Sequence, residues 1–496
     1  GGVVVVSGGG AESKIGGWRV GGTAMPRLHS IMRALAYLVL LALCIHLILS
    51  LVPTLRTGLE DYDDGSTAIG TSPLTAELCQ YLELKETGAE GVVDSEEYKL
   101  KGMAVVFRHG ERSPIVKDDL SSHHDCAPFR DQDRKSFKDY TEVVNSSEFA
   151  RFLKVDKEFE QYPLHPLTSE CSPGNLTAEG ALQLSRLGNH LRRAYKKTEL
   201  FNEENRLDVK VVVSPYRRTF QSSVALLSSF LFPLKELVDE VHVKYSNETF
   251  HCVDAFCVCP PALGWRLEYE KEHLAYFLND TSELRERTQR IFANIDSTKA
   301  SDDPFKMMDV LLGRYICRRH PLPCAKGGEC VSYDLFKEML MYTTRRGAEM
   351  FNAGNSFISA RLHTAEAQAI LGYVARMGEE LKERPHTNRI KIFSGHDTTV
   401  GPLLRTLRIP YVDFPRYASH LVFEVYHDRA GNDHLRLVYN GHDRTAELPF
   451  CGGKSMCPMN TFTRFARSGI FATLGFSNAT QLCDPTLTPQ PHNAYV

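Results

Sequence analysis

A short apolar run ends in a charged turn at Val105-Val106-Phe107-Arg108-His109-Gly110-Glu111-Arg112-Ser113-Pro114. The apolar half has the length of a buried strand, and the glycine that follows indicates a turn. Arg108 and Arg112 flank His109 in that turn. Guanidinium groups bind phosphate oxygens two at a time, and neutral imidazole is a nucleophile at or below pH 7. The segment therefore predicts a phosphate site at a strand end, in preference to solvated arginines beside a core histidine.

A second segment of the same kind lies far downstream at Ile390-Lys391-Ile392-Phe393-Ser394-Gly395-His396-Asp397. Another apolar run ends in a turn, and this turn carries His396 and Asp397 side by side. A histidine can bind phosphate, and a carboxyl group can donate a proton to a leaving oxygen. Open α/β sheets bind their ligands outside the carboxyl ends of the strands, so we expect the two turns to form one site.

A third strand-to-turn segment, Val211-Val212-Val213-Ser214-Pro215-Tyr216-Arg217-Arg218-Thr219, carries two adjacent arginines. Side chains of neighbouring residues diverge, so one pocket is expected to receive only one of them. We assign Arg218 to the site and interpret Arg217 as a surface charge.

These three segments resemble the histidine acid phosphatase family, in which Arg-His-Gly-x-Arg-x-Pro comes early, an Arg-Thr-x-x-Ser follows, and His-Asp ends a later strand. The resemblance implies a phosphomonoesterase without metal or cofactor. His109 would be the nucleophile that becomes phosphorylated, and Asp397 the acid. The residues that the resemblance implies for phosphate binding are Arg108, Arg112, Arg218 and His396.

The chain between these segments predicts an α/β fold. Thr177 is a natural N-cap for a helix whose apolar face includes Leu184 and Leu191, and residues 207–213 form a strand after it. Alternating strands and helices indicate a mostly parallel sheet flanked by helices. Residues of about 226–385 show mainly helical spacing and predict a helical cap inserted into the domain. Residues 421–426 and 435–440 predict a hairpin.

Length and composition are those of a globular protein with more than one part. The chain has 496 residues, of which 43% are apolar and 24% charged. Its net charge of −3 lacks the excess of positive charge that is typical of nucleic-acid-binding proteins, so no nucleic-acid partner is expected. Attraction of an anionic substrate must therefore come from the clustered arginines.

Residues 34–52 are nineteen uncharged residues and predict a transmembrane signal anchor. As a helix they span about 28 Å, close to the roughly 30 Å hydrocarbon core of a bilayer. Arginines precede the run and acidic residues follow it, which places the N-terminus in the cytosol. A cleaved signal peptide is the alternative, but the run is long and lacks a small-x-small cleavage site.

The anchor sets the remaining boundaries. Residues 1–33 are the expected cytosolic tail, in which the Gly- and Val-rich residues 1–24 precede Met25 and are typical of a flexible tail or of upstream sequence outside the native product. Acidic, Gly- and Ser-containing residues 53–98 predict a lumenal stem. The phosphatase domain is expected over 99–483, followed by a C-terminal tail over 484–496.

The cysteines support a lumenal domain. Thirteen are present, and Cys44 lies in the expected anchor, which leaves an even number in an oxidising compartment. Up to six disulfides are therefore expected, with their pairing open. Zinc is the alternative, but the spacings around Cys259 and Cys330 do not match a zinc finger. Five Asn-x-Ser/Thr sequons follow the anchor, at Asn145, Asn175, Asn247, Asn279 and Asn478.

The N-terminal anchor and several motifs are similar to those of family members that act on Golgi glycans. The resemblance implies removal of the 2-phosphate from xylose in the linker of proteoglycan core proteins, with linker-synthesising glycosyltransferases as candidate partners. Alternatives are a general acid phosphatase or inositol-polyphosphate-type phosphatase, a mutase-like transferase, and a lumenal phosphoglycan-binding protein. The segments concerned are 162–166, 176–177, 252–259, 437–441, 450–451 and 456–458.

Overall fold

The described residues of the computed structural model are Cys79 and 88–487, without 116–125, 129–130, 170, 203, 205, 239, 247–258, 280–282, 294–303, 319, 325–327, 353–356, 385 and 410–414. The chain divides into two compact units, 1–67 and 68–496, and every described residue belongs to the second. The expected cytosolic tail and the expected anchor over 34–52 lie outside the described residues. In the part that is described, no helix is both long and apolar enough to cross a membrane.

Nine strands of the described residues form one sheet in the order β2-β4-β3-β5-β1-β6-β7-β8, with β9 against β7. β2, β4, β3, β5 and β1 are parallel, whereas β6, β7, β8 and β9 join through antiparallel pairs. The α/β class is confirmed, and the sheet is mixed because the expected hairpin, now β6 and β7, extends it beyond β1. The strands are β1 Tyr98–Arg108, β2 Leu153–Val155, β3 Arg206–Val213, β4 Val241–Tyr245, β5 Thr387–Gly395, β6 His420–Asp428, β7 Asp433–Tyr439, β8 His442–Asp443 and β9 Cys457–Pro458.

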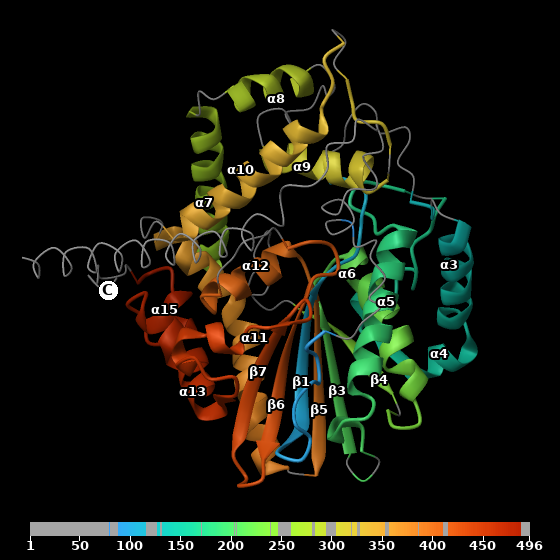
Figure 1. Ribbon diagram of the computed structural model, residues 1–496, viewed down its shortest axis with the longest axis vertical. Coiled ribbons are helices and arrows are strands. Elements are labelled where there is room, and N and C mark those ends of the chain that lie inside the picture. Colours follow the sequence, from blue (N-terminus) through green and yellow to red (C-terminus); the bar gives the residue numbers. More distant parts are fainter. Residues whose placement is uncertain are drawn as a thin grey trace, which may run out of the picture. The chain divides into compact units, whose positions relative to one another are not determined.

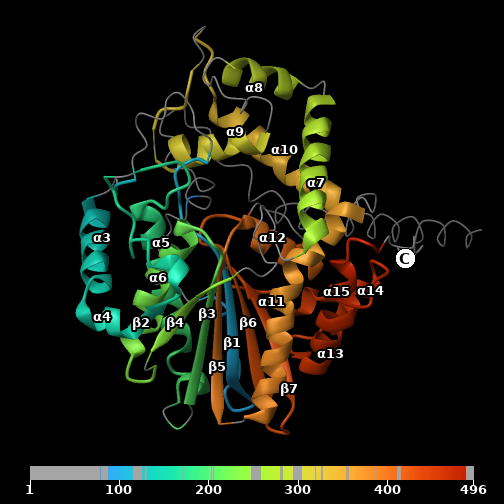
Figure 2. The same ribbon diagram turned by 180° about the vertical axis from the view of Figure 1, so that it is seen from behind.

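Helices cover both faces of this sheet (Figures 1 and 2). One face carries α5 and α6, and the other carries α11, α12 and α13. The helices are α3 Asp131–Val144, α4 Ser147–Phe152, α5 Ala178–Tyr195, α6 Arg217–Phe230, α7 Pro260–Asn279, α8 Glu283–Ala293, α9 Pro304–Val310, α10 Tyr333–Asn352, α11 Phe357–Glu383, α12 Asp397–Thr406, α13 Met459–Arg464, α14 Ile470–Ala472 and α15 Ala479–Leu482.

Strand β1 has a core on each side because successive side chains of a strand point to opposite faces. Ala104 and Val106 are fully buried in the core that includes α11, whereas Val105 and Phe107 are fully buried in the core that includes α5 and α6. A parallel strand covered on both faces requires a continuous apolar sequence, which is what precedes Arg108. Burial on both sides fixes the end of β1 and therefore the start of the charged turn.

The helix expected after residue 176 begins as the sequence predicts. The Thr177 hydroxyl accepts a hydrogen bond from the Gly180 N–H at 3.0 Å, and α5 starts at Ala178. Leu184 and Leu191 are both fully buried. A threonine N-cap satisfies one of the N–H groups that the first helical turn leaves without a partner.

Helices α6 and α12 lie near one end of the sheet, and helices α7, α8, α9 and α10 lie beyond that end (Figures 1 and 2). We call these four helices, together with the π-helical turn Leu311–Ile316 that follows α9, the cap. The range expected for a cap, about 226–385, also contains β4, which pairs with β2 and β3 in the sheet. The helical elements beyond the sheet therefore begin at α7.

Ten of the cysteines form disulfides among the described residues, in place of the zinc alternative. No group of His, Cys, Asp or Glu in this part of the chain is arranged to hold a metal ion. Cys252 and Cys257 lie outside the described residues. The pairs are Cys79–Cys317, Cys126–Cys171, Cys259–Cys483, Cys324–Cys330 and Cys451–Cys457.

Candidate active site

The three charged turns meet because their strands are neighbours. β5 lies between β3 and β1, and all three run in the same direction. In the register of the sheet, Arg108 is opposite Gly395 and Val213 is opposite Ser394. The residues that follow each strand therefore emerge at one edge, where an open α/β sheet binds its ligand.

Two glycines let the first turn approach α5 closely. A Cβ atom on Gly110 would lie 2.1 Å from the Gly180 carbonyl oxygen, and one on Gly180 would lie 2.1 Å from the Glu111 carbonyl oxygen. Side chains cannot be accommodated at either position without moving backbone. Gly110 of Arg-His-Gly and Gly180 at the start of α5 therefore allow the same close contact between the two backbones, although they are 70 positions apart in sequence.

His109 is buried, with only 2% of its surface exposed. Its Nδ1 is 2.7 Å from the Gly110 carbonyl oxygen. A carbonyl can only accept, so Nδ1 carries the proton and the lone pair of the neutral ring is on Nε2. Burial, followed by the charges of Arg218 and Arg108, lowers the pKa of His109 well below its usual value. The imidazole is therefore neutral at neutral pH, and its Nε2 can act as a nucleophile.

The three arginines expected to bind phosphate hold defined contacts at this edge. Arg108 donates from Nη1 to the Pro415 carbonyl at 2.6 Å, and Arg112 forms an ion pair with Asp309 of α9 at 2.8 Å. Arg218 lies with Nη2 3.4 Å from Nδ1 of His396. Burial and the neighbouring Arg112 lower the pKa of Arg218 to about 10. The structure thus gathers several buried positive charges with only partial compensation.

The two adjacent arginines at the start of α6 differ in their surroundings. The Arg218 guanidinium stacks over the Tyr216 ring at 4.4 Å and contacts His396. Arg217 is half-buried and makes no hydrogen bond or ion pair within the described residues. The structure therefore places Arg218 next to the other expected site residues, whereas Arg217 does not contact them.

His396 and Asp397 follow β5 as expected. His396 is 2% exposed, and its ring centre lies 5.4 Å from that of His109. Its Nε2 is 2.8 Å from the Ser214 hydroxyl, which fixes the ring. Asp397 begins α12, with one carboxylate oxygen 3.3 Å from Nη2 of Arg108 and 27% of the side chain exposed.

The charge state of Asp397 depends on the arginines. Burial alone would raise its pKa, but Arg108 and Arg112, aided by the Thr398 N–H, hold the pKa of Asp397 below its ordinary value. Without a phosphate in the site, the carboxyl group is therefore ionised. A bound phosphate would add negative charge beside it and would favour the protonated form.

Sequence reasoning missed two residues of the site, Asp309 and Tyr417. The Tyr417 ring lies 4.4 Å from the Arg108 guanidinium carbon and shields that charge from solvent. Asp309 comes from the cap and touches Arg112. Neither residue belongs to a strand-to-turn segment, so only the tertiary arrangement identifies them. In contrast, the Ser of the Arg-Thr-x-x-Ser segment was visible in sequence, and the Ser222 hydroxyl accepts from the Gly110 N–H at 3.2 Å.

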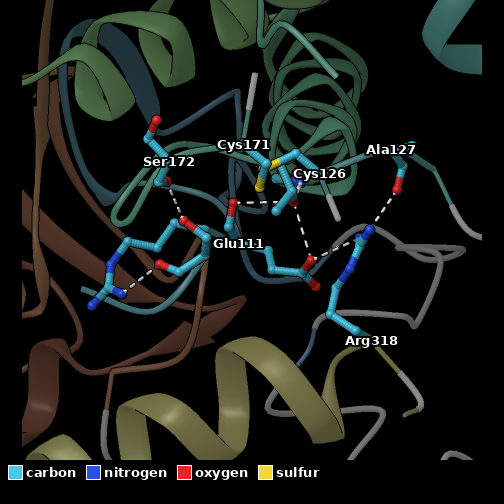
Figure 3. Close-up of a disulfide and its surroundings, with 10 residues drawn as sticks. Glu111, Cys126, Ala127, Cys171, Ser172 and Arg318 are labelled. Atoms are coloured by element: carbon cyan, nitrogen blue, oxygen red, sulfur yellow. Dashed lines mark hydrogen bonds and ion pairs between the residues drawn. A yellow bond between two sulfur atoms is a disulfide. The ribbon is translucent and has the colours of Figure 1, made fainter. Parts of the chain in front are cut away.

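Glu111 joins the catalytic turn to the segment that follows the cap's π-helical turn. Figure 3 shows Arg318 reaching between the Glu111 carboxylate, at 3.3 Å, and the Ala127 carbonyl, at 2.6 Å, beside the Cys126–Cys171 disulfide. The Ser113 hydroxyl also donates to the carbonyl of Ser172, the residue after Cys171, at 2.6 Å. Burial raises the pKa of Glu111 to about 7, although Arg318 acts in the opposite direction.

This raised pKa predicts a pH-dependent stability. The folded chain holds the Glu111 proton more tightly than the unfolded chain, in which the carboxyl group has its ordinary pKa of 4.5. The proton on Glu111 contributes fully to the free energy of unfolding below pH 4.5, and this contribution is lost as pH rises through about 7. The total loss in the free energy of unfolding is about 3 kcal/mol. We expect the melting temperature of Glu111→Gln to fall less than that of wild type between pH 5 and pH 8, measured by thermal denaturation.

The control for this experiment is Glu329→Gln. Hydrogen bonding to Arg290 lowers the pKa of Glu329, so that residue stays ionised over the whole interval and the variant should keep the wild-type slope. Equal slopes for wild type and Glu111→Gln would show that Glu111 does not titrate in this range.

Known phosphatases are similar to this chain in sequence. Residues 99–302 match the family description of the histidine phosphatase superfamily (branch 2). 2-Phosphoxylose phosphatase 1 of Xenopus tropicalis is 27% identical over 82% of this chain and 82% of its own, and that of Homo sapiens is 29% identical over 80% and 83%. Among solved structures, the phytase of D. castellii aligns with a TM-score of 0.49 at 14% identity, over 85% of this chain and 92% of its own. Residues 99–302 are thus similar to the histidine phosphatase superfamily (branch 2), and the chain is a phosphomonoesterase that resembles the histidine acid phosphatases.

Proposed function

We propose that the chain is a lumenal phosphatase that works through a phosphohistidine and removes the 2-phosphate from xylose in the glycosaminoglycan–protein linker. The observation that supports the mechanism best is the hydrogen bond from Nδ1 of His109 to the Gly110 carbonyl, because it leaves the Nε2 lone pair available. The proposed substrate is carried over from the names of the relatives, which match this chain over 80% and 82% of its length.

In the first step, Nε2 of His109 attacks phosphorus while the bond from phosphorus to the sugar oxygen breaks. Arg108, Arg112 and Arg218 bind the phosphoryl oxygens and offset their charge, which is worth most in a site from which water is largely excluded. His396, next to Arg218, lies beside the same group. The departing alkoxide takes a proton from Asp397.

The proton on Asp397 comes with substrate binding. Before substrate binds, the carboxyl group is ionised because the nearby arginines lower its pKa. A phosphate ester occupies those arginines and brings negative charge to the carboxyl group, so its pKa rises. A phosphate monoester has its second pKa near 6 and can carry the needed proton into the site as the monoanion.

In the second step, water attacks phosphorus and the bond between phosphorus and Nε2 breaks. The Asp397 carboxylate, now without its proton, accepts one from the attacking water. Inorganic phosphate leaves, and His109 returns to the neutral form. Two displacements at phosphorus give overall retention of configuration.

Turnover of a phosphoxylosylated linker oligosaccharide by the purified lumenal segment tests the proposed substrate. We expect its kcat/KM to exceed that for inositol hexakisphosphate and for lysophosphatidic acid. A preference for either of these would replace xylose 2-phosphate by an inositol polyphosphate or a lipid phosphate as the substrate class. Tight binding of the oligosaccharide without turnover would instead favour a phosphoglycan-binding protein.

Topology makes a separate prediction. If residues 34–52 are an uncleaved signal anchor, cells expressing the chain should yield membrane-retained, N-glycosylated protein whose C-terminus is protected from protease in intact vesicles. Glycosidase treatment before electrophoresis measures the glycans, and detergent provides the control that exposes the C-terminus. An unglycosylated cytosolic product would contradict the anchor and the lumenal location together.

A further inference from the structure

The contacts of Asp309 in the cap point to a role in phosphate binding that lies outside the three strand-to-turn segments. We propose that Asp309 is a positioning residue: it fixes the Arg112 guanidinium so that one edge stays available for phosphate, and it makes phosphate affinity depend on this cap residue. The inference rests on the proposed function of Arg112 as a phosphate ligand.

Two acceptors occupy the Nη1 group of Arg112. Oδ1 of Asp309 lies 2.8 Å from Nη1, and the Ser113 carbonyl oxygen lies 3.0 Å from the same nitrogen. Nη1 has two hydrogens, so these acceptors satisfy both. The guanidinium is planar and rigid, and fixing Nη1 at two points therefore fixes the direction of its other N–H bonds.

The remaining edge of Arg112 is the one suited to an oxyanion. Nε is buried and finds no hydrogen-bond partner in the part of the chain that the structure describes, although Arg112 as a whole is only 5% exposed. Leaving a buried donor without a partner is costly, so a ligand or a water at this edge would stabilise it. The N–H bonds of Nε and Nη2 are parallel and match two oxygens of one phosphate.

Asp309 is itself held in place. Its second oxygen, Oδ2, accepts a hydrogen bond from the Ile115 N–H at 2.8 Å. Gly313, in the π-helical turn that follows α9, packs against the same loop, since a Cβ there would lie 3.0 Å from the Arg112 carbonyl oxygen. The cap therefore contacts both the backbone and the side chain of the catalytic turn. A movement of α9 would move the arginine with it.

A carboxylate beside an arginine could also act as a competitor of phosphate. The geometry favours positioning, because Asp309 uses Nη1 and leaves Nε and Nη2 without an acceptor among the described residues. Phosphate can then bind without displacing Asp309. The two roles predict opposite signs: loss of the carboxylate weakens phosphate binding if Asp309 positions Arg112, and strengthens it if Asp309 competes.

Binding of inorganic phosphate, measured by isothermal titration calorimetry on the intact lumenal segment, tests the sign. We expect Asp309→Ala to weaken phosphate binding by about tenfold or more, since small misplacements of a binding group are costly. Asp309→Asn keeps one oxygen acceptor and should recover part of the affinity. Glu329→Ala, which removes the carboxylate that lies 2.8 Å from Arg290 of α8 in the cap, should leave phosphate affinity unchanged.

A double-mutant cycle with Arg112→Ala separates positioning from a general effect on the cap. If Asp309 acts through Arg112, then Asp309→Ala should have little further effect on phosphate affinity once Arg112 is absent. Unchanged or tighter binding in Asp309→Ala, or an equal loss with and without Arg112, would overturn the inference. Wild-type affinity in Arg112→Ala alone would instead refute the proposed phosphate role of Arg112.

Discussion

Replacement of His109 by alanine is expected to abolish hydrolysis of every phosphate ester, because the nucleophile of the first step is gone. The loss should be as large for an aryl phosphate as for xylose 2-phosphate, since both esters need the same attack at phosphorus. Rapid quench with radiolabelled substrate should trap an acid-labile phosphoenzyme in wild type and none in His109→Ala. Thermal denaturation should show that the variant is folded, although the imidazole is buried against Gly110.

Asp397→Asn should separate substrates by their leaving group. A sugar alkoxide is a poor leaving group and needs the proton of Asp397, whereas an aryl oxide departs without one. We therefore expect hydrolysis of xylose 2-phosphate to fall much further than hydrolysis of an aryl phosphate, measured as kcat/KM for the two substrates on the same preparation. Wild type and Asp397→Asn should both form the phosphoenzyme with the aryl ester.

The stereochemistry at phosphorus decides between this mechanism and direct attack by water. Two in-line displacements retain configuration, and one inverts it. Inversion with a chiral phosphate ester, or substantial turnover by His109→Ala, would require water to attack the substrate itself. Equal losses for both substrates in Asp397→Asn would mean that Asp397 acts on binding and not on the leaving group.

The parts of the site that local sequence could predict are those built by a strand and its own turn. The apolar run before Arg108 predicts a buried strand because β1 is covered on both faces, and the turn must then begin where the apolar residues end. The same holds for β5 before His396. Since β1, β5 and β3 are parallel neighbours, their turns had to meet.

Contacts that cross the fold could not be predicted in the same way. Asp309 lies 197 positions from Arg112, in a helix whose sequence shows nothing unusual, and only the docking of α9 places it against the arginine. Disulfide pairing is similar, because Cys259 and Cys483 are separated by 224 positions. By contrast, β4 carried a signal that was overlooked: its burial alternates along Val241-His242-Val243-Lys244-Tyr245, and the apolar and polar residues alternate with it.

The adjacent arginines of α6 provide the sharpest comparison between two positions of the same sequence type. Arg218 stacks on Tyr216 and approaches His396, and burial together with Arg112 lowers its pKa, so it shares the space of the other site charges. Arg217 has no such contacts among the described residues. If each of Arg108, Arg112 and Arg218 stabilises the transferring phosphoryl group, alanine at any one of them should lower kcat/KM at least about a hundredfold.

Arg217→Ala is the matched control, because it removes the same charge one residue away at the same helix N-terminus. Its kcat/KM should stay within about threefold of wild type, since a charge outside the site contributes only a screened field. Measuring both variants at low and high salt separates the two effects: the loss in Arg218→Ala should persist at high salt, and any small loss in Arg217→Ala should disappear. Equal losses at the two positions would show that the third phosphate-binding arginine is wrongly assigned, and a larger loss in Arg217→Ala would assign it to Arg217.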